Sequence, residues 1–306
     1  MTLLDDVQQM VERVADAVAA SVVRIGRGPG RGAGIVLADG AVLTNAHNLR
    51  GSEATVSFAA GRVERGTVAG VDLDSDLAVV HVPTGGARAL DWHDGEVRLG
   101  AALFAVSRPP GGGTRVTIGT VSGSGRAFRG PRGRLVPGGL EHTAPLARGS
   151  SGSPVVDADG KLVGINTHRL GEGFYLAIPA DVELRTRVDA LARGQSPHHH
   201  YLGLALLPPR AARRLRAAVG LPERDGLLVR AIDQDGPASR AGVRAGDLLV
   251  EAAGRTLGSP DDLFEVLGAL ADGEALRLRV VRGVEELDVR VDVAWTSGAG
   301  EEAGTA

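Results

Sequence analysis

The segment Gly149-Ser150-Ser151-Gly152-Ser153-Pro154 places a serine inside a glycine-flanked turn. Apolar residues follow it directly, and a turn at 157–160 leads into a second apolar run at 162–165, which is typical of a β-hairpin. The turn is therefore short and anchored in a sheet, unlike a flexible glycine-serine loop. Backbone N–H groups in such a turn can converge on one point, which is what an oxyanion hole requires.

Two segments upstream carry the partners that a reactive serine needs. Thr44-Asn45-Ala46-His47 ends a strand-like stretch, and Asp74-Ser75-Asp76 precedes a buried-looking strand at 77–82. Taken singly, His47 fits the end of any strand and Asp76 any turn. Together with Ser151 they supply a base, an orienting carboxylate and a nucleophile. The order predicts a serine protease.

Five motifs in this order resemble the trypsin-like serine proteases of the HtrA or Deg family, and the resemblance covers nearly the whole chain. The motifs of this chain are Thr44 to Asn48, Asp72 to Val79, Gly149 to Pro154, Gly164 to Thr167, and Tyr175 to Pro179. The resemblance implies a mainly β fold, with a chymotrypsin-like double β-barrel protease domain followed by an α+β PDZ domain.

The same resemblance implies a role for each matching residue. Ser151 is the expected nucleophile, His47 the general base and acid, and Asp76 the residue that orients His47. Their neighbours supply the backbone: the oxyanion hole is expected from the N–H groups of Gly149, Ser150 and Ser151, and the substrate-pairing strand from Ile165, Asn166 and Thr167.

Three residues depart from the family pattern. Asn48 replaces an apolar residue after the histidine, and Ser150 and Ser153 replace an asparagine and a second glycine. A positive φ at Ser153 would cost roughly 1 kcal/mol or more and tilt the oxyanion donors. His142 is a second candidate base near Ser151 in sequence, although it lacks the strand-end setting of His47.

The second half of the chain resembles a PDZ domain, most specifically at 235–250. Such a domain captures a peptide C-terminus in a backbone nest and adds the peptide to a sheet edge. The expected nest is Tyr201, Leu202, Gly203 and Leu204. The facing helix is expected to begin at Ser259, because Pro260 and Asp262 complete a helix-start signature. Its apolar stripe is mostly core, and one turn is expected to line the groove: Leu263, Val266 and Leu267.

These patterns divide the chain into five regions. An N-terminal amphipathic helix at 1–20 precedes the protease domain at 21–192, a linker at 193–200, the PDZ domain at 201–294 and a disordered tail at 295–306. Three neighbouring histidines, His198 to His200, fall in the linker. Adjacent side chains of an extended chain do not converge on one ion, so we expect no metal there, and no cofactor elsewhere.

Charge and targeting signals limit the partners. The net charge is −3, so the arginines at 210–216 predict a solvated helix face rather than a nucleic-acid site. The chain has no cysteine, which permits oxidising and reducing compartments alike. Residues 1–20 match neither a signal peptide nor a membrane span, which favours a cytoplasmic protein, or an exported or tethered one whose targeting segment lies outside this sequence.

Two functions from different classes follow. The first is an endopeptidase of protein quality control that cleaves unfolded or misfolded polypeptides, while its PDZ domain binds peptide C-termini or regulates activity. The family resemblance adds a homotrimer to this reading, although the aromatic residues commonly used for it are absent before Phe58. The second is a proteolytically weak or inactive peptide-binding scaffold or holdase, crippled by Asn48 and Ser153.

Overall fold

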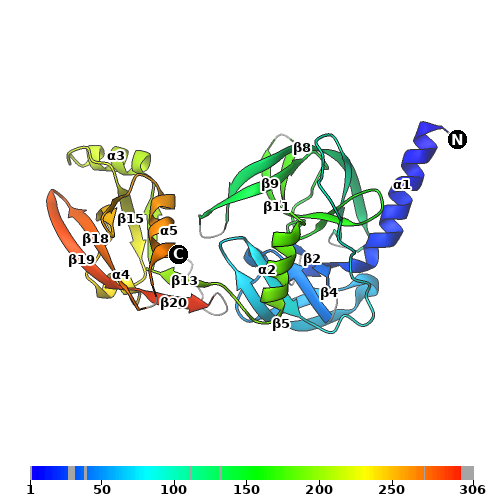
Figure 1. Cartoon of the computed structure of the whole chain (residues 1–306), viewed down its shortest axis with the longest axis horizontal. Coiled ribbons are helices and arrows are strands. Elements are labelled where there is room, and N and C mark those ends of the chain that lie inside the picture. Colours follow the sequence, from blue (N-terminus) through cyan, green and yellow to red (C-terminus); the bar gives the residue numbers. More distant parts are fainter. Residues whose placement is uncertain are drawn as a thin grey trace. The chain divides into compact units, whose positions relative to one another are not determined.

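The computed structural model divides the chain into two compact units, Met1–Pro197 and His198–Ser297 (Figure 1). It describes residues 2–26, 32–37, 40–109, 112–130, 133–171, 173–271 and 273–297. Each unit has its own hydrophobic core.

The first unit contains two closed antiparallel barrels, drawn in blue to cyan and in green in Figure 1. The first barrel has the order β1-β2-β3-β6-β5-β4, from β1 (Val22–Ile25), β2 (Gly32–Val36), β3 (Ala41–Thr44), β4 (Glu53–Ser57), β5 (Val63–Asp72) and β6 (Leu77–His81). The second has the order β10-β11-β12-β9-β8-β7, from β7 (Ala102–Ser107), β8 (Arg115–Arg129), β9 (Leu135–His142), β10 (Pro154–Val156), β11 (Leu162–Gly171) and β12 (Phe174–Pro179). Closure leaves neither barrel with a long exposed edge, and the predicted double barrel is confirmed.

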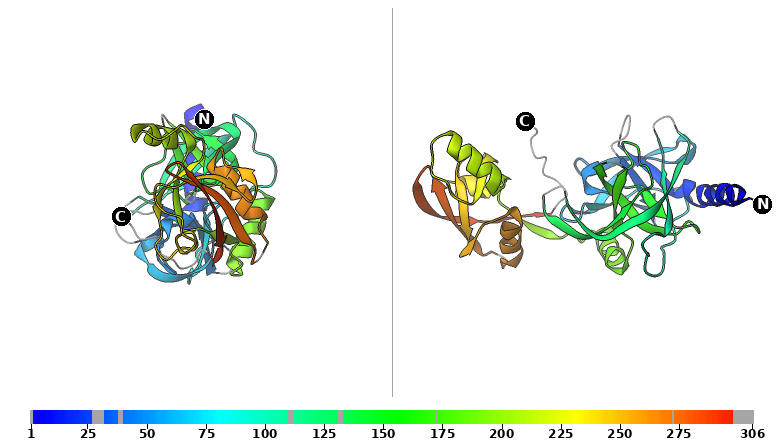
Figure 2. Two further views of the ribbon diagram at one scale, coloured as in Figure 1. Left: turned by 90° about the vertical axis from the view of Figure 1, so that its left-hand side faces the viewer. Right: turned by 90° about the horizontal axis from the view of Figure 1, so that it is seen from above.

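Two helices complete this unit. Helix α1 (Leu3–Val18) starts at a capping box between Thr2 and Asp5, and its C-terminal half packs Val14 and Val18 into the core that the two barrels share. Its N-terminal half projects beyond the barrels, with Leu3 and Leu4 each 78% exposed (Figures 1 and 2). Helix α2 (Val182–Ala192) covers β5 and β6 with its buried residues Leu184, Val188 and Leu191. Among the described residues, 3-10 turns lie at η1 (Ala19–Ser21), η3 (Ala46–Asn48) and η4 (Ala59–Gly61).

The second unit is an antiparallel sheet with three helices. The sheet order is β14-β15-β16-β18-β19, with β17 paired to β16, from β14 (Leu204–Leu207), β15 (Leu227–Ile232), β16 (Leu248–Ala252), β17 (Arg255–Thr256), β18 (Ala275–Arg282) and β19 (Glu285–Asp292). The helices are α3 (Pro209–Ala218), α4 (Pro237–Arg240) and α5 (Pro260–Ala269). Ser259 and Asp262 form the capping box of α5, so the predicted helix start is confirmed.

The α5 stripe differs from its predicted role in a groove. Leu263, Val266 and Leu267 are at most 8% exposed and belong to the core of this unit. Hydrophobic periodicity identifies the buried face of a helix, and here that face is filled by the sheet. These side chains therefore offer little surface to a peptide.

The ends of this unit also differ from the predicted boundaries. β13 (His198–Tyr201) pairs with β20 (Ala294–Ser297) in a two-stranded sheet. The expected linker at 193–200 thus ends in a strand, and the expected tail from 295 begins in its partner; 298–306 lie outside the described residues. The His200 ring nitrogen Nδ1 lies 2.6 Å from the Leu267 carbonyl of α5, which gives this histidine a structural role. The pairing of β13 with β20 is made by backbone groups of segments about 100 residues apart, so the side-chain pattern of either segment does not reveal it.

None of the helices in the described part of the chain is both long and apolar enough to span a bilayer.

Candidate active site

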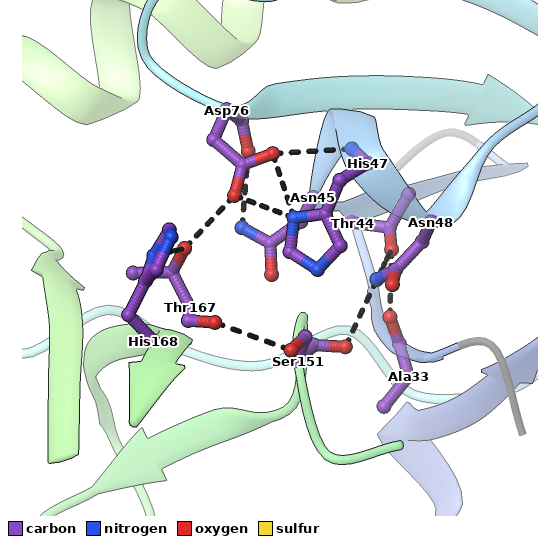
Figure 3. Close-up of polar contacts among 9 residues, drawn as sticks. All are labelled: Ala33, Thr44, Asn45, His47, Asn48, Asp76, Ser151, Thr167 and His168. Atoms are coloured by element: carbon purple, nitrogen blue, oxygen red, sulfur yellow. Dashed lines mark hydrogen bonds and ion pairs between the residues drawn. The ribbon is translucent and has the colours of Figure 1, made fainter. Parts of the chain in front are cut away.

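His47 and Asp76 meet at the end of the first barrel (Figure 3). His47 lies on η3, directly after β3, and Asp76 in the turn between β5 and β6. The Asp76 carboxylate is fully buried and lies 2.8 and 2.9 Å from His47 Nδ1 through its two oxygens. It also accepts the His47 backbone N–H at 3.1 Å and the Thr167 hydroxyl at 2.8 Å. With the Nδ1 proton held by the carboxylate, Nε2 is the nitrogen left to accept a proton.

Asp76 is strained, and its neighbours hold it in place. Its φ is +60°, in the left-handed region that non-glycine residues rarely adopt. The Asp76 carbonyl accepts the Asn45 side-chain amide at 3.0 Å and the Ala46 N–H at 3.2 Å. The strain is therefore balanced by hydrogen bonds on both sides of the residue.

A second layer of contacts clamps the turn that carries Asp76. Asp72 accepts the backbone N–H groups of Asp74 and Ser75 at 3.0 and 3.1 Å. Arg187, from α2, donates to Ser75 Oγ at 2.5 Å, and Arg134 pairs with Asp74 at 2.8 Å. Asp72 and Asp74 thus support the turn, and the carboxylate that contacts the His47 ring is that of Asp76.

Ser151 lies in the turn before β10, whose shape depends on two glycines. Gly149 and Gly152 have φ of +81° and +87°, and a side chain on Gly152 would collide with the Ala33 carbonyl. Among the described non-glycine residues only Asp76 and Ala253 have a positive φ. The expected strain at Ser153 is therefore wrong: the residue is buried without strain, and its hydroxyl accepts the Asn166 amide at 3.0 Å.

The Ser151 hydroxyl donates to the Thr167 carbonyl at 3.2 Å. Figure 3 shows the His47 ring between the Asp76 carboxylate and Ser151, with no hydrogen bond drawn from the ring to that hydroxyl. Catalytic hydrogen bonds are often long or misaligned before substrate binds, and rotation about one side-chain bond would turn the hydroxyl away from Thr167. The structure thus brings the three predicted residues to one place and joins two of them directly.

The backbone N–H groups of Gly149, Ser150 and Ser151 donate to no group in the described part of the chain. Buried or half-buried backbone donors are normally paired, and Ser150 is 4% exposed. Three adjacent uncommitted donors beside the nucleophile are available for an anionic oxygen.

The predicted substrate strand is displaced by two residues. Ile165 is paired on both sides, with Pro154 and Ile178, and Asn166 is likewise occupied: it donates its N–H to the Ser153 carbonyl at 2.9 Å and accepts the Gly152 N–H at 2.7 Å. Beyond that point β11 pairs only with β12 among the described strands. The open edge therefore comprises Thr167, His168 and Arg169. The prediction was displaced because the alternation of buried residues along a strand does not reveal where the neighbouring strand ends.

His142 is not placed as a base. Its ring is fully buried, bonds to Asn166 Oδ1 at 2.8 Å and stacks on Tyr175 at 5.7 Å between ring centroids. Burial lowers the pKa of His142 below its ordinary value of 6.5, partly offset by the bond to Asn166. Asn166 in turn bonds to Ser153, so His142 supports the nucleophile turn from behind.

Sequence reasoning missed a histidine, His168, whose ring lies beside that of His47. The His168 ring lies 6.4 Å from the His47 ring and 5.2 Å from the Phe128 ring, between centroids. Its Nδ1 is 2.9 Å from the Thr167 hydroxyl. Burial lowers the pKa of His168, with Asp76 opposing the shift and His47 adding to it. Its place directly after the Gly-Ile-Asn-Thr motif was the available signal.

The described residues contain no group of three or more side chains of His, Cys, Asp or Glu arranged to hold a metal ion. The geometry above uses side chains and backbone donors of the chain itself.

The expected peptide nest lies at the start of the second unit. Gly203 has φ of +76°; its carbonyl accepts the Asp233 N–H at 2.8 Å, and the Leu202 carbonyl accepts the Ala238 N–H at 3.0 Å. Tyr201 is held by its hydroxyl on Asp233 at 2.8 Å. β14, which follows at Leu204, is the last strand of its sheet and has one partner strand, β15. A shaped turn therefore leads into an exposed sheet edge.

Two barrels with a histidine, an aspartate and a serine at their junction define a trypsin-like peptidase scaffold. Family models agree: "Trypsin-like peptidase domain" matches 32–165 and "PDZ domain" matches 210–293. The chain belongs to the HtrA family of trypsin-like serine proteases with a PDZ domain, and the predicted resemblance is confirmed.

Curated proteins with similar sequences support the same family. It is 33% identical over 285 residues to a "Probable periplasmic serine endoprotease DegP-like" of Halomonas elongata, covering 89% of this chain and 59% of that protein. It is 31% identical over 280 residues to the "Putative serine protease HhoA" of Synechocystis, covering 87% of this chain and 71% of that protein. The chain spans about half to three fifths of the length of the DegP-like relatives it matches. Their periplasmic names lend no support to the expected cytoplasmic location.

Solved structures support the fold. The serine endoprotease from Yersinia pestis matches with a TM-score of 0.59 and 23% identity, over 94% of this chain and 98% of that one. The HtrA-type protease AlgW with a decapeptide matches with a TM-score of 0.60 and 22% identity, over the same shares.

Proposed function

We propose that the chain is a serine endopeptidase that cleaves unfolded or misfolded polypeptides. The observation that carries the proposal is the contact of the buried Asp76 carboxylate with His47 Nδ1, at 2.8 Å. Figure 3 shows the His47 ring between this carboxylate and Ser151, whose turn also presents the uncommitted N–H donors. A carboxylate in this place sets the imidazole tautomer and stabilises the imidazolium that forms during attack.

Each catalytic step then has a group to perform it. Ser151 Oγ attacks the scissile carbonyl carbon while His47 Nε2 takes its proton, and the oxyanion accepts hydrogen bonds from the N–H groups of Gly149, Ser150 and Ser151. His47 returns the proton to the departing amine, which leaves an acyl-enzyme at Ser151. Water, activated by His47, then hydrolyses the ester. Removing one oxyanion donor typically costs about 3–4 kcal/mol of barrier.

The open edge of β11 supports an unfolded substrate. An extended polypeptide can pair its backbone with Thr167 to Arg169, which is a sequence-tolerant mode of recognition that a folded protein does not offer. The nest at Tyr201 to Leu204 and the β14 edge support capture of a peptide C-terminus by the second unit in the same manner.

The test is cleavage of unfolded casein by the wild type beside a Ser151→Ala variant. We expect the variant to lose activity by about 10⁶-fold in kcat, since removal of a triad nucleophile leaves only binding and oxyanion contributions. Ser52→Ala, at an exposed serine, is the matched control and should cleave like the wild type. Equal activity of wild type and Ser151→Ala would contradict the proposal. Absence of cleavage by both, together with suppression of casein aggregation, would favour the holdase.

The assembly and the compartment are further proposals of the same kind. Exposed Leu3 and Leu4 on α1 support an oligomer, for which we retain the homotrimer. Size-exclusion chromatography with light scattering tests this assembly by comparing the molar mass of the wild type with that of the double variant Leu3→Ser/Leu4→Ser.

The names of the DegP-like relatives support an exported location. Cell fractionation of the native protein tests that location.

A further inference from the structure

Asn48 connects the two halves of the proposed active site. It directly follows His47 on η3, is 2% exposed, and comes from the first barrel. Its Nδ2 donates to the Ser151 carbonyl at 2.9 Å and to Thr44 Oγ1 at 3.0 Å (Figure 3). Asn48 and Ser151 are 103 positions apart in the chain.

The surrounding residues are shaped for this amide. A side chain on Gly32 would overlap the Asn48 amide, so the glycine provides its space. Thr44 Oγ1 donates to the Ala33 carbonyl at 2.7 Å, and the Ala33 N–H donates to the Ser151 carbonyl at 2.7 Å. The Ser151 carbonyl is thus held by two donors, both from the first barrel.

The orientation of the amide follows from its partners. Both groups that face Nδ2 have lone pairs to offer, whereas a flipped amide would set its oxygen against the Ser151 carbonyl oxygen. In this orientation Asn48 Oδ1 is buried without a partner in the described residues. An unpaired buried oxygen is unfavourable, and an apolar residue of similar size would avoid it. The two donated bonds are the benefit that this arrangement offers.

We infer that Asn48 is a positioning residue that holds the Ser151 backbone at a set distance from His47. The inference rests on the proposed function. Because Nδ2 and the Ala33 N–H grip the carbonyl of the nucleophile itself, their loss lets the turn from Gly149 to Gly152 shift, and with it both Oγ and the oxyanion donors. Displacements of about 1 Å in such a site can cost about 10²-fold in rate.

The test compares Asn48→Leu with the wild type. Leucine has a similar size and no donor. We expect the second-order rate of Ser151 labelling by a fluorophosphonate, and kcat for an unfolded substrate, to fall about 10- to 100-fold. KM and the midpoint of the acid limb of the pH profile should stay unchanged, because the edge of β11 and the His47–Asp76 pair are untouched. Val56→Ala, a buried cavity variant in the first barrel, is the control for lost stability.

Labelling of Asn48→Leu within twofold of the wild type would overturn the inference, as would an equal loss in Val56→Ala. Failure of the wild type itself to react would instead contradict the proposed function. Hydrogen exchange then decides the inference independently: the N–H groups of Ala33, Gly152 and Ser153, all bonded around this turn, should exchange at least about tenfold faster in Asn48→Leu. Unchanged exchange at these N–H groups would overturn the positioning role of Asn48.

Discussion

The base side and the nucleophile side of the site are held in opposite ways. His47 and Asp76 are fixed through their side chains: the carboxylate accepts from the His47 ring, the His47 N–H and the Thr167 hydroxyl. Ser151 is fixed through its backbone, by Ala33 and Asn48 on its carbonyl, while its hydroxyl makes one bond at 3.2 Å. The base needs one tautomer and orientation, whereas the nucleophile needs a steady position and a hydroxyl that can turn.

The two sides also differ in which group bears the energetic cost of the arrangement. On the base side it is the backbone strain of Asp76, at φ of +60°. On the nucleophile side the left-handed positions are glycines, and the cost is the unpaired Oδ1 of Asn48. Strain and unpaired polar groups of this kind persist only where the surroundings compensate for them.

Among substitutions that leave the nucleophile itself in place, breaking the base side should give the largest effect. Asp76→Asn keeps the size of the side chain but presents an amide that favours the wrong imidazole tautomer, so we expect kcat to fall about 10⁴-fold. Steady-state hydrolysis of a casein-derived peptide measures it. Asp74→Asn, two residues away, weakens one contact of the same turn, the partly exposed pair with Arg134, and leaves the His47–Asp76 pair in place; it is the control for the turn and should change kcat by less than about fivefold. A similar loss in both variants would show that the turn, rather than the carboxylate, is what matters.

On the nucleophile side, Ser153→Gly should change stability more than rate. Loss of the hydroxyl that accepts the Asn166 amide, together with added chain entropy in the unfolded state, should lower the free energy of unfolding by about 1–2 kcal/mol. Chemical denaturation measures this change. Fluorophosphonate labelling should stay within about threefold, because Ser153 already lies outside the left-handed region. A labelling rate at least ten times higher would mean that the serine does restrain the oxyanion turn.

The support behind the nucleophile should show the smallest effect, as a dependence of stability on pH. The pKa of His142 is lowered by burial, so between its folded value and the ordinary 6.5 the unfolded chain binds more protons than the folded one. The free energy of unfolding should therefore decrease as pH falls below about 6.5. His168, whose pKa is also lowered, contributes with the same sign.

Urea denaturation from pH 8 to pH 5 of the wild type, His142→Gln and His168→Gln separates these contributions. Each variant should show a shallower decline than the wild type, and the decline should be absent above about pH 7. A decline that is equally steep in His142→Gln would contradict an uncharged buried His142 ring.

The sequence foretold the parts of the molecule that local patterns encode. The glycine-flanked serine turn, the strand-end histidine and the aspartate before an apolar strand each have a physical signature within a few residues. The same is true of the capping box at Ser259. The double barrel and the PDZ fold, by contrast, were expected through the family resemblance and not from local patterns. Family membership followed from the order of these segments.

Tertiary structure decided what depends on distant partners. Ile165 and Asn166 are occupied because β10 and its turn pair with them, which moves the open edge to Thr167. Thr167 reaches Asp76 across 91 positions, and Asn48 reaches Ser151 across 103. The sequence alone presented Asn48 as a departure from the family, and only closure of the two barrels against each other made it a bridge. Side-chain periodicity reports which face is buried, but the partner that buries it, and the hydrogen bonds it offers, are set by how the chain folds back on itself.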